Sequence, residues 1–263
     1  MRGLMNRLVD THCHLDAEEF NADRDTVAAA AKAAGIVGIV VPAVEKANFA
    51  MVLQLCERHP HCVAALGIHP LYISRSQPED LKVLRELLAI EPVVAVGEIG
   101  LDFFVADQNL AQQEWFFVEQ LKLAQEFNLP VILHVRRAVD AILKNLRKIK
   151  VVGGVAHAFN GSRQQADEFI KLGFKLGFGG AMTFERALKI RELATTLPLE
   201  SIVLETDAPD IAPAWLNKQR NSPTQLPKIA EVLAQLRQET LGAIFETTTA
   251  NALAVLPRLK MAV

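Results

Sequence analysis

Residues 92–102 read PVVAVGEIGLD, an apolar run typical of a buried β-strand that carries one carboxylate, Glu98, before its end. A carboxylate in apolar surroundings is strongly destabilising unless another group pairs with it. Four other short apolar runs carry groups that can bind a metal near their C-terminal ends: His12 and His14, His134, His157 and Asp207. Six such groups at the ends of strands indicate one shared metal site.

Apolar runs of this kind recur eight times along the chain, at 8–15, 36–44, 62–69, 93–101, 131–135, 154–159, 174–179 and 202–206. The segments between them read as helices, for example 23–34, 108–128 and 162–172. Strand and helix alternating eight times in a chain of about 250 residues is what a (β/α)8 TIM barrel requires. Because no Pro-, Ser- or Gly-rich linker divides the chain, we expect an α/β fold with a single domain spanning residues 1–263.

The C-terminal part of the chain departs from this repeat. Residues 207–224 read as a long loop after the eighth strand, rich in Pro, Asn and Arg, and a helix is expected at 222–237. Residues 240–259 read as an extra C-terminal helical segment. Loops after barrel strands often carry function, so we expect Arg220 and Asn221 to face the substrate.

Composition limits the class of protein. The chain has 263 residues, 51% of them hydrophobic, and its net charge of -2 gives no broad basic field for duplex DNA. Cys13, Cys56 and Cys62 form no C-x-x-C pair, which fits a reducing compartment. Residues 1–6 lack the apolar stretch of a secretory signal, and the longest uncharged apolar run, 35–44, is too short to cross a bilayer. We therefore expect a soluble cytoplasmic protein with no membrane contact and no obligate protein partner.

The alternation of side chains along a strand sorts the residues around the expected site. Residues two apart point to the same face, so His12 and His14 both point inward while Cys13 points toward the helices. The same rule places three further polar side chains beside the metal-binding groups: Arg136 next to His134, Glu205 next to Asp207, and Asp102 on the face of Glu98. The active site of a barrel lies where these C-terminal strand ends converge.

The number and type of ligands favour two metal ions. Six imidazole and carboxylate groups exceed the four of a tetrahedral zinc, and the lack of a thiolate argues against a structural Cys-rich site. Two divalent ions about 3.5 to 4 Å apart, bridged by a carboxylate, would account for six ligand groups. Glu98 is the natural bridge because it lies between the other ligands in sequence. The mixed ligands suit Zn, Mn or Ni, with Mg as a further candidate.

The order of these ligands resembles that of the amidohydrolase superfamily. Five strings in particular are similar to the TatD family of metal-dependent deoxyribonucleases: DTHCHLD at 10–16, GIHP at 67–70, GEIGLD at 97–102, HVR at 134–136 and ETDAP at 205–209. The similarity extends over most of the chain, from residue 10 to about residue 223. The resemblance is also consistent with membership of a less characterised branch of that family, known only as metal-dependent hydrolases.

The resemblance implies a set of ligands for each metal. One ion would be held by His12, His14, Glu98 and Asp207. The other would be held by Glu98, His134 and His157. Glu98 would take the place of the carboxylated lysine that bridges the metals in many amidohydrolases. Family members commonly have Tyr at the positions of Phe103 and Asp210, and Asp210 adds negative charge at the mouth of the site.

Three hypotheses for function follow. The first is a phosphodiesterase, a deoxyribonuclease that trims single-stranded DNA from an end with a water activated by two metals. Asp207 and Glu98 would be its catalytic groups, with Asp207 deprotonating the water and Arg136 taking up phosphoryl charge. The second is a small-molecule amidohydrolase or lactonase on the same barrel. The third is a protein that binds metal or nucleic acid without turnover, which a complete hydrolytic ligand set disfavours.

Several individual roles stay open at this point. His69 ends the third strand toward the pocket, where contact with the substrate is favoured over a structural role. Arg136 suits a phosphate because a guanidinium fork matches phosphate oxygens, but pairing with Asp102 is equally consistent. Glu205 either orients a ligand histidine or caps a nearby amide. Phe103 and Phe104 suit either base stacking or a hydrophobic lid.

Overall fold

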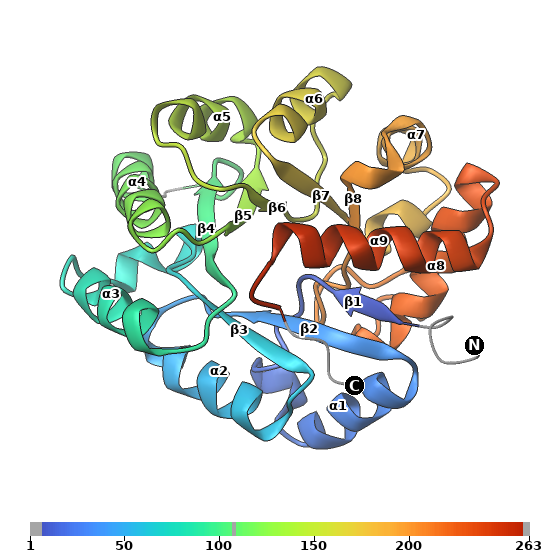
Figure 1. Ribbon diagram of the computed structural model, residues 1–263, viewed down its shortest axis with the longest axis horizontal. Helices are drawn as coiled ribbons and strands as arrows, with labels where there is room; N and C mark the ends of the chain where they lie inside the picture. Colours follow the sequence, from blue (N-terminus) through green and yellow to red (C-terminus); the bar gives the residue numbers. More distant parts are fainter. Residues whose placement is uncertain (1–6, 107–108, 260–263) are drawn as a thin grey trace.

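The strands of the computed structural model, which describes residues 7–106 and 109–259, form one parallel sheet in sequence order (Figure 1). They are β1 (Leu8–Asp10), β2 (Ile36–Pro42), β3 (Cys62–Leu66), β4 (Ala95–Asp102), β5 (Val131–Arg136), β6 (Gly154–Ala156), β7 (Phe174–Phe178) and β8 (Ile202–Leu204). A hydrogen bond of 3.1 Å from the Thr11 amide to the Leu204 carbonyl joins the two ends of the sheet. The predicted (β/α)8 barrel is therefore confirmed.

Helices α1 to α8 surround the strands in Figure 1. The α-helices are α1 (Arg24–Ala33), α2 (Lys46–Arg58), α3 (Asp80–Ile90), α4 (Leu110–Glu126), α5 (Val139–Lys148), α6 (Arg163–Lys171), α7 (Leu188–Thr196), α8 (Leu226–Arg237) and α9 (Leu241–Val255). Short 3-10 helices are η1 (Glu18–Phe20), η2 (Pro70–Arg75), η3 (Gly180–Thr183), η4 (Leu199–Ser201), η5 (Ala214–Leu216) and η6 (Pro223–Gln225). Residue 108, where the fourth helix was expected to begin, lies outside the described residues, as do 1–6 and 260–263.

The extra C-terminal helix closes one end of the barrel. Figure 1 shows α9 lying across the strands. Apolar side chains from the barrel strands, including Val9, Ala95 and Val203, pack in one buried cluster with Leu256 and Leu259, which follow this helix. Burial of this layer stabilises the barrel and leaves the opposite end, where the strands finish, for the site.

Side chains alternate regularly along most strands but not along β4. Ile132 belongs to the apolar layer inside the barrel, and His134, two residues later, reaches the site. Along β4, by contrast, Ala95 lies in the apolar layer and Glu98 reaches the site three residues later. The pairing register between β4 and β5 shifts between Val96 and Ile99, which permits this change of face.

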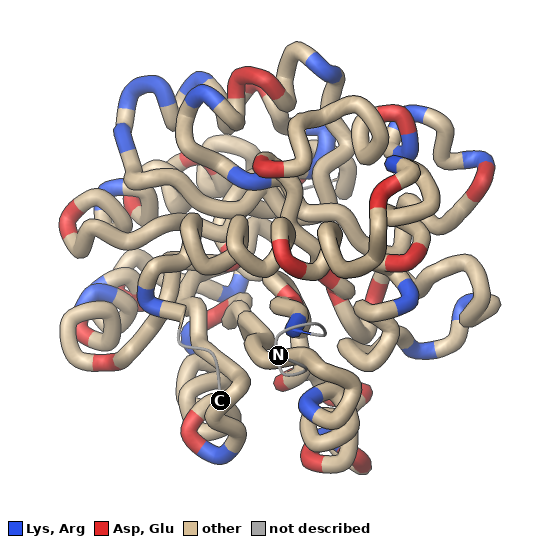
Figure 2. The backbone as a smooth tube through the Cα atoms, turned by 45° about the vertical axis from the view of Figure 1, so that its right-hand side comes forward, with Lys and Arg blue, Asp and Glu red and all other residues tan. Residues whose placement is uncertain are grey.

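The outer surface carries charges of both signs. Figure 2 shows Lys and Arg interspersed with Asp and Glu over the helices. Cys13 is fully buried in the core between the strands and the helices, as the alternation of side chains predicts. Within residues 7–106 and 109–259, no helix combines the length and apolar character needed to cross a membrane.

Candidate metal centre

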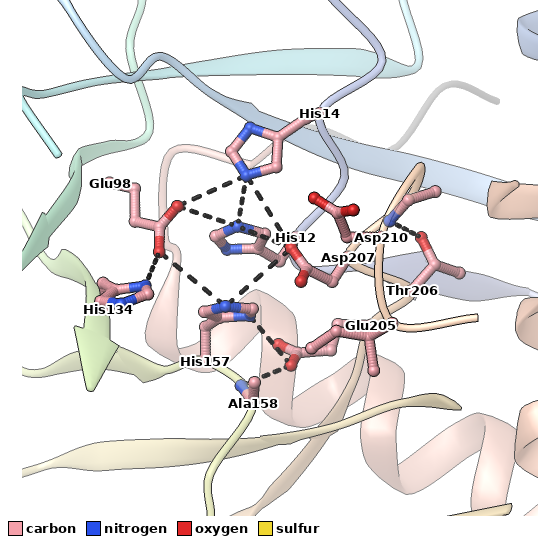
Figure 3. Close-up of polar contacts among 12 residues, drawn as sticks. His12, His14, Glu98, His134, His157, Ala158, Glu205, Thr206, Asp207 and Asp210 are labelled. Carbon is pink, nitrogen blue, oxygen red and sulfur yellow. Dashed lines mark hydrogen bonds and ion pairs between the residues drawn. The ribbon is translucent and has the colours of Figure 1, made fainter. Parts of the chain in front are cut away.

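One oxygen of Glu98 belongs to a cluster of four candidate ligand atoms (Figure 3). Glu98 Oε2 lies 3.2 Å from His12 Nε2 and 3.4 Å from His14 Nε2, and the two imidazole nitrogens are 3.1 Å apart. Asp207 Oδ1 lies 3.5 Å from His12 Nε2 and 3.8 Å from His14 Nε2. Ligands about 2.0 to 2.1 Å from one tetrahedral ion are about 3.4 Å from one another. The spacing of this cluster therefore fits a divalent ion.

The other oxygen of Glu98 faces a second group of histidines. Glu98 Oε1 lies 3.0 Å from His134 Nδ1 and 3.8 Å from His157 Nε2. His157 Nε2 is also 3.9 Å from Asp207 Oδ1. Glu98 is only 2% exposed, so its charge needs partners inside the protein. The structure thus brings all six expected ligands together, with Glu98 between two sets of donor atoms.

Each histidine of the second set is held by a carboxylate on its far side. Glu205 Oε1 lies 3.1 Å from His157 Nδ1, and Asp102 Oδ2 lies 2.9 Å from His134 Nε2. A carboxylate that accepts the hydrogen of one ring nitrogen leaves the lone pair of the other nitrogen free to bind a metal. Both carboxylates therefore fix the tautomers that metal binding requires.

Glu205 fulfils both of the roles left open by the sequence. Besides contacting His157, its Oε1 accepts a hydrogen bond of 2.6 Å from the amide of Ala158. Glycine at 177 on β7 provides the space, because a Cβ added to Gly177 would lie 2.1 Å from Glu205 Oε2. This close approach explains why β7 contributes a glycine rather than a ligand to the site.

Asp10 is a part of the site to which the sequence analysis gave no role. Its carboxylate is fully buried and accepts hydrogen bonds from the amides of His12 and Thr206, at 3.2 and 3.0 Å, and from the Thr206 hydroxyl at 2.6 Å. Burial raises the pKa of Asp10 to about 7. Asp10 thus ties the ends of β1 and β8 together next to the ligands. Asp10 lies two residues before His12, and this spacing is the feature of the sequence from which its place beside the ligands could have been predicted.

Comparison with known proteins decides the family. The sequence pattern described as TatD related DNase matches residues 9–257. This chain belongs to the TatD family. The uncharacterized metal-dependent hydrolase YjjV of Escherichia coli K12 is 43% identical over 248 residues, covering 93% of this chain and 96% of that protein. The crystal structure of YjjV, described as a TatD homolog, superimposes with a TM-score of 0.93 at 42% identity, covering 96% of this chain and 99% of that one.

A further TatD family relative has a named activity. The 3'-5' ssDNA/RNA exonuclease TatD of Pantoea sp. strain At-9b is 37% identical over 247 residues, covering 90% of this chain and 95% of that protein. Membership of the family together with the ligand geometry makes this chain a TatD-type metal-dependent hydrolase. The predicted family is therefore confirmed.

His69 lies beside the metal cluster but is not placed to bind a metal. Its Nε2 is 3.5 Å from Glu98 Oε1, close enough to be counted among the ligands with His134. Its Nδ1, however, accepts a hydrogen bond of 3.1 Å from the amide of Leu71. Burial lowers the pKa of His69 to about 4, so the ring is neutral and its hydrogen is on Nε2. A protonated Nε2 donates to an oxygen and does not bind a metal.

Two residues of the loop after β8 bond to other parts of the protein. Arg220 donates to the Asp23 carboxylate at 2.7 and 2.9 Å and to the Glu19 carbonyl at 2.6 Å, so its charge is already paired away from the cluster. Asn221 is fully buried, and its amide donates to the Thr206 carbonyl at 2.8 Å and the Asp210 carbonyl at 2.9 Å. Both side chains hold the loop in place: the buried Asn221 does not face a substrate as expected, while the contact of the partly exposed Arg220 with a substrate stays a prediction.

Arg136 remains available at the mouth of the site. Its side chain is 49% exposed, and Nη1 is 4.0 Å from Asp102 Oδ2, too far for a direct hydrogen bond. The guanidinium lies 3.9 Å from the centre of the Phe104 ring. The pairing with Asp102 considered above is therefore a long-range one, and within residues 7–106 and 109–259 the guanidinium of Arg136 donates no hydrogen bond.

The titration of the cluster follows from these contacts. Burial lowers the pKa of His14 and of His157, but neighbouring carboxylates outweigh burial and raise these pKa values to about 9 and about 10. Burial raises the pKa of Asp207 to about 6, with His157 and His14 partly offsetting it. Burial also acts to raise the pKa of Glu98, yet the surrounding histidines hold it well below its usual range. The metal-free cluster thus carries protons at neutral pH that a dication would displace.

Proposed function

We propose that this protein is a phosphodiesterase that shortens single-stranded DNA from an end and uses two divalent ions. The observation that carries this proposal is the position of Glu98, with a separate set of donor atoms facing each of its oxygens. His12, His14 and Asp207 would hold one ion, and His134 and His157 the other. Zn, Mn, Ni and Mg are the candidate metals.

The residues around the metals supply the remaining chemistry. When bound, the two ions would polarise a phosphoryl oxygen and lower the pKa of the attacking water. Asp207 has one oxygen directed at the histidines, which leaves Oδ2 to take the proton of the water. His69 would donate through Nε2, and Arg136 through its guanidinium, to the non-bridging oxygens of the phosphate.

The charge of the protein favours a single strand over a duplex. With a net charge of -2, the cationic side chains near the mouth, such as Arg136 and Lys218, can neutralise about two phosphates, against six or more for a strong duplex binder. A flexible strand end can enter a barrel mouth, whereas a stiff duplex about 20 Å wide cannot. The activity named for the Pantoea relative supports the same choice.

A small-molecule amidohydrolase or lactonase is the second candidate. Asp210 favours it, because this carboxylate lines a groove of about 530 Å³ formed by the loop after β8, beside the ligand Asp207 (Figure 3). Asp210 opposes a polyanion locally, although Lys218 and Arg220 line the same groove. The mouth would then admit a neutral or cationic ester or amide in preference to a strand.

Labelled substrates distinguish the two candidates. We expect the metal-loaded protein to shorten linear single-stranded DNA progressively and to leave a closed circular single strand intact, since a circle has no end. Cleavage of circles as fast as linear strands would exclude end-dependent trimming. Cleavage of esters or lactones from a test panel, with no phosphodiester cut under any divalent metal, would establish the second candidate. The Asp207→Asn protein provides the control for contaminating nucleases.

A further inference from the structure

Two arginine side chains surround an exposed aromatic ring at the mouth of the barrel. Phe104 follows β4 and is 46% exposed. The guanidinium of Arg136 lies 3.9 Å from the centre of its ring, and that of Arg137 lies 4.6 Å from it. We call Phe104, Arg136 and Arg137 the Phe104 cluster. Arg136 is the last residue of β5 and Arg137 follows it, close in sequence to the ligand His134.

The Phe104 cluster is fixed to the metal centre through Asp102. One oxygen of Asp102 accepts hydrogen bonds from the amides of Phe104 and Val105, at 2.9 and 3.1 Å. Its other oxygen lies 2.9 Å from the Nε2 of His134. The amide of Phe103 also bonds to the carbonyl of Arg136 at 2.9 Å. The same carboxylate thus positions both a ligand histidine and the exposed ring.

The charges of this cluster distinguish it from a hydrophobic lid. In the described part of the chain, Arg137 makes no ion pair with a carboxylate within 4.0 Å, and the one ion pair of Arg136 is the 4.0 Å contact with Asp102. A lid over an apolar substrate would bury the ring against other apolar groups. Here the ring lies among two positive charges and solvent, a combination that suits a ligand with both a planar ring and negative charge.

We propose that the Phe104 cluster is a subsite for the nucleotide next to the scissile phosphate. The base of that nucleotide stacks on the planar groups of the cluster, and its phosphate bonds to Arg137, while Arg136 reaches the scissile phosphate beside it. The inference rests on the proposed function, because it assigns the neighbouring nucleotide of the same strand. The subsite assigns a second phosphate contact to Arg137. The backbone φ of Arg137, 56°, sets this residue apart from the extended strand before it.

Binding of a strand that resists cleavage tests this subsite. Fluorescence anisotropy would measure the affinity of the metal-loaded protein for a labelled phosphorothioate single strand. We expect Phe104→Ala to weaken binding about tenfold, the effect of losing one base stacked on an aromatic ring, while Phe104→Trp retains the affinity. Arg137→Ala should weaken binding and reduce its salt dependence by about one phosphate contact. Arg58→Ala, with the same loss of charge at the end of α2, should bind as the wild type does.

Strands with one base removed locate the stacked position. At one position near the end of the strand, we expect loss of the base to weaken binding of the strand to the wild-type protein. The same loss should have little further effect on binding to the Phe104→Ala protein, which already lacks the stacking ring. Wild-type affinity in Phe104→Ala and Arg137→Ala, or no strand binding by the wild type, would overturn the subsite. Failure of the proposed function gives a different result: a strand bound through Phe104 but no phosphodiester cleaved in the separate assay with ordinary DNA.

Discussion

The Nδ1 atom of His157 lies 3.1 Å from Oε1 of Glu205, which leaves the Nε2 of His157 facing Glu98 and Asp207. A histidine ring offers a lone pair to a metal on only one nitrogen, and the partner of the other nitrogen selects which. Glu205 therefore influences the metal centre without touching a metal.

Replacement of Glu205 by glutamine should lower metal affinity. The amide keeps the shape of the side chain but loses the negative charge that favours a hydrogen on His157 Nδ1. We expect Glu205→Gln to weaken binding of one ion about 10- to 100-fold, as competition with a chelating dye would measure. Glu86→Gln, an exposed carboxylate on α3, serves as the control. Equal affinities in Glu205→Gln and the wild type would show that Glu205 acts only as a cap for Ala158.

Metal binding should release protons. The pKa values of His14 and His157, raised to about 9 and about 10, lie above neutral pH, so both rings are protonated in the metal-free protein. Ligand histidines must be neutral, and metal affinity should therefore increase as the pH rises from about 6 to about 8. Calorimetry in buffers with different ionisation enthalpies would count the protons. Metal uptake without proton release would contradict the ligand roles of these histidines.

The rate of hydrolysis should fall in acid. The ligand histidines and the base Asp207 act only when deprotonated, so the active metal-loaded form is lost as the pH falls below about 6, where imidazoles take up protons. We expect kcat for bis(p-nitrophenyl) phosphate to decline below that pH, and Asp207→Asn to lose about a thousandfold in kcat. A profile that stays flat from about pH 5 to about pH 8 would mean that another group takes the proton.

Two arginines near the mouth should differ in their effect on DNA cleavage. Among the residues that the structure describes, Arg136 has no hydrogen-bond acceptor for its guanidinium, whereas Arg220 is paired with Asp23. We expect Arg136→Ala to lower kcat/KM for single-stranded DNA about tenfold, the effect of losing one hydrogen bond to a charged group. Arg220→Ala should change it by less than about twofold. The reverse order would restore Arg220 as the phosphate contact.

The strands and most of the site could be predicted because both depend on local pattern. Parallel strands buried on both faces are continuous apolar runs, and alternation along β5 and β6 puts His134 and His157 on the inner face. The predicted C-terminal ends of β1 and β8, at residues 15 and 206, were less accurate, since these strands stop at Asp10 and Leu204. The Asp10 carboxylate takes the amide hydrogens of His12 and Thr206 that a longer ladder would use.

Contacts between distant parts of the chain could not be predicted. Arg220 pairs with Asp23, which lies 197 residues away in sequence, and only the folded chain shows that this partner is near. The contact of Arg137 with Phe104 likewise depends on how two loops approach each other. The alternation of side chains along the strand correctly predicted that Glu205 lies at the site. The space that Gly177 provides for Glu205 became apparent only in the structure.

The bridging position of Glu98 is tested most directly by anomalous X-ray scattering from crystals of the metal-loaded protein, measured above and below the absorption edge of the metal. We expect two peaks about 3.5 to 4 Å apart, one near Oε2 with His12 and His14 and the other near Oε1 with His134 and His157. A single peak at full occupancy, or peaks away from the Glu98 carboxylate, would contradict the two-metal site.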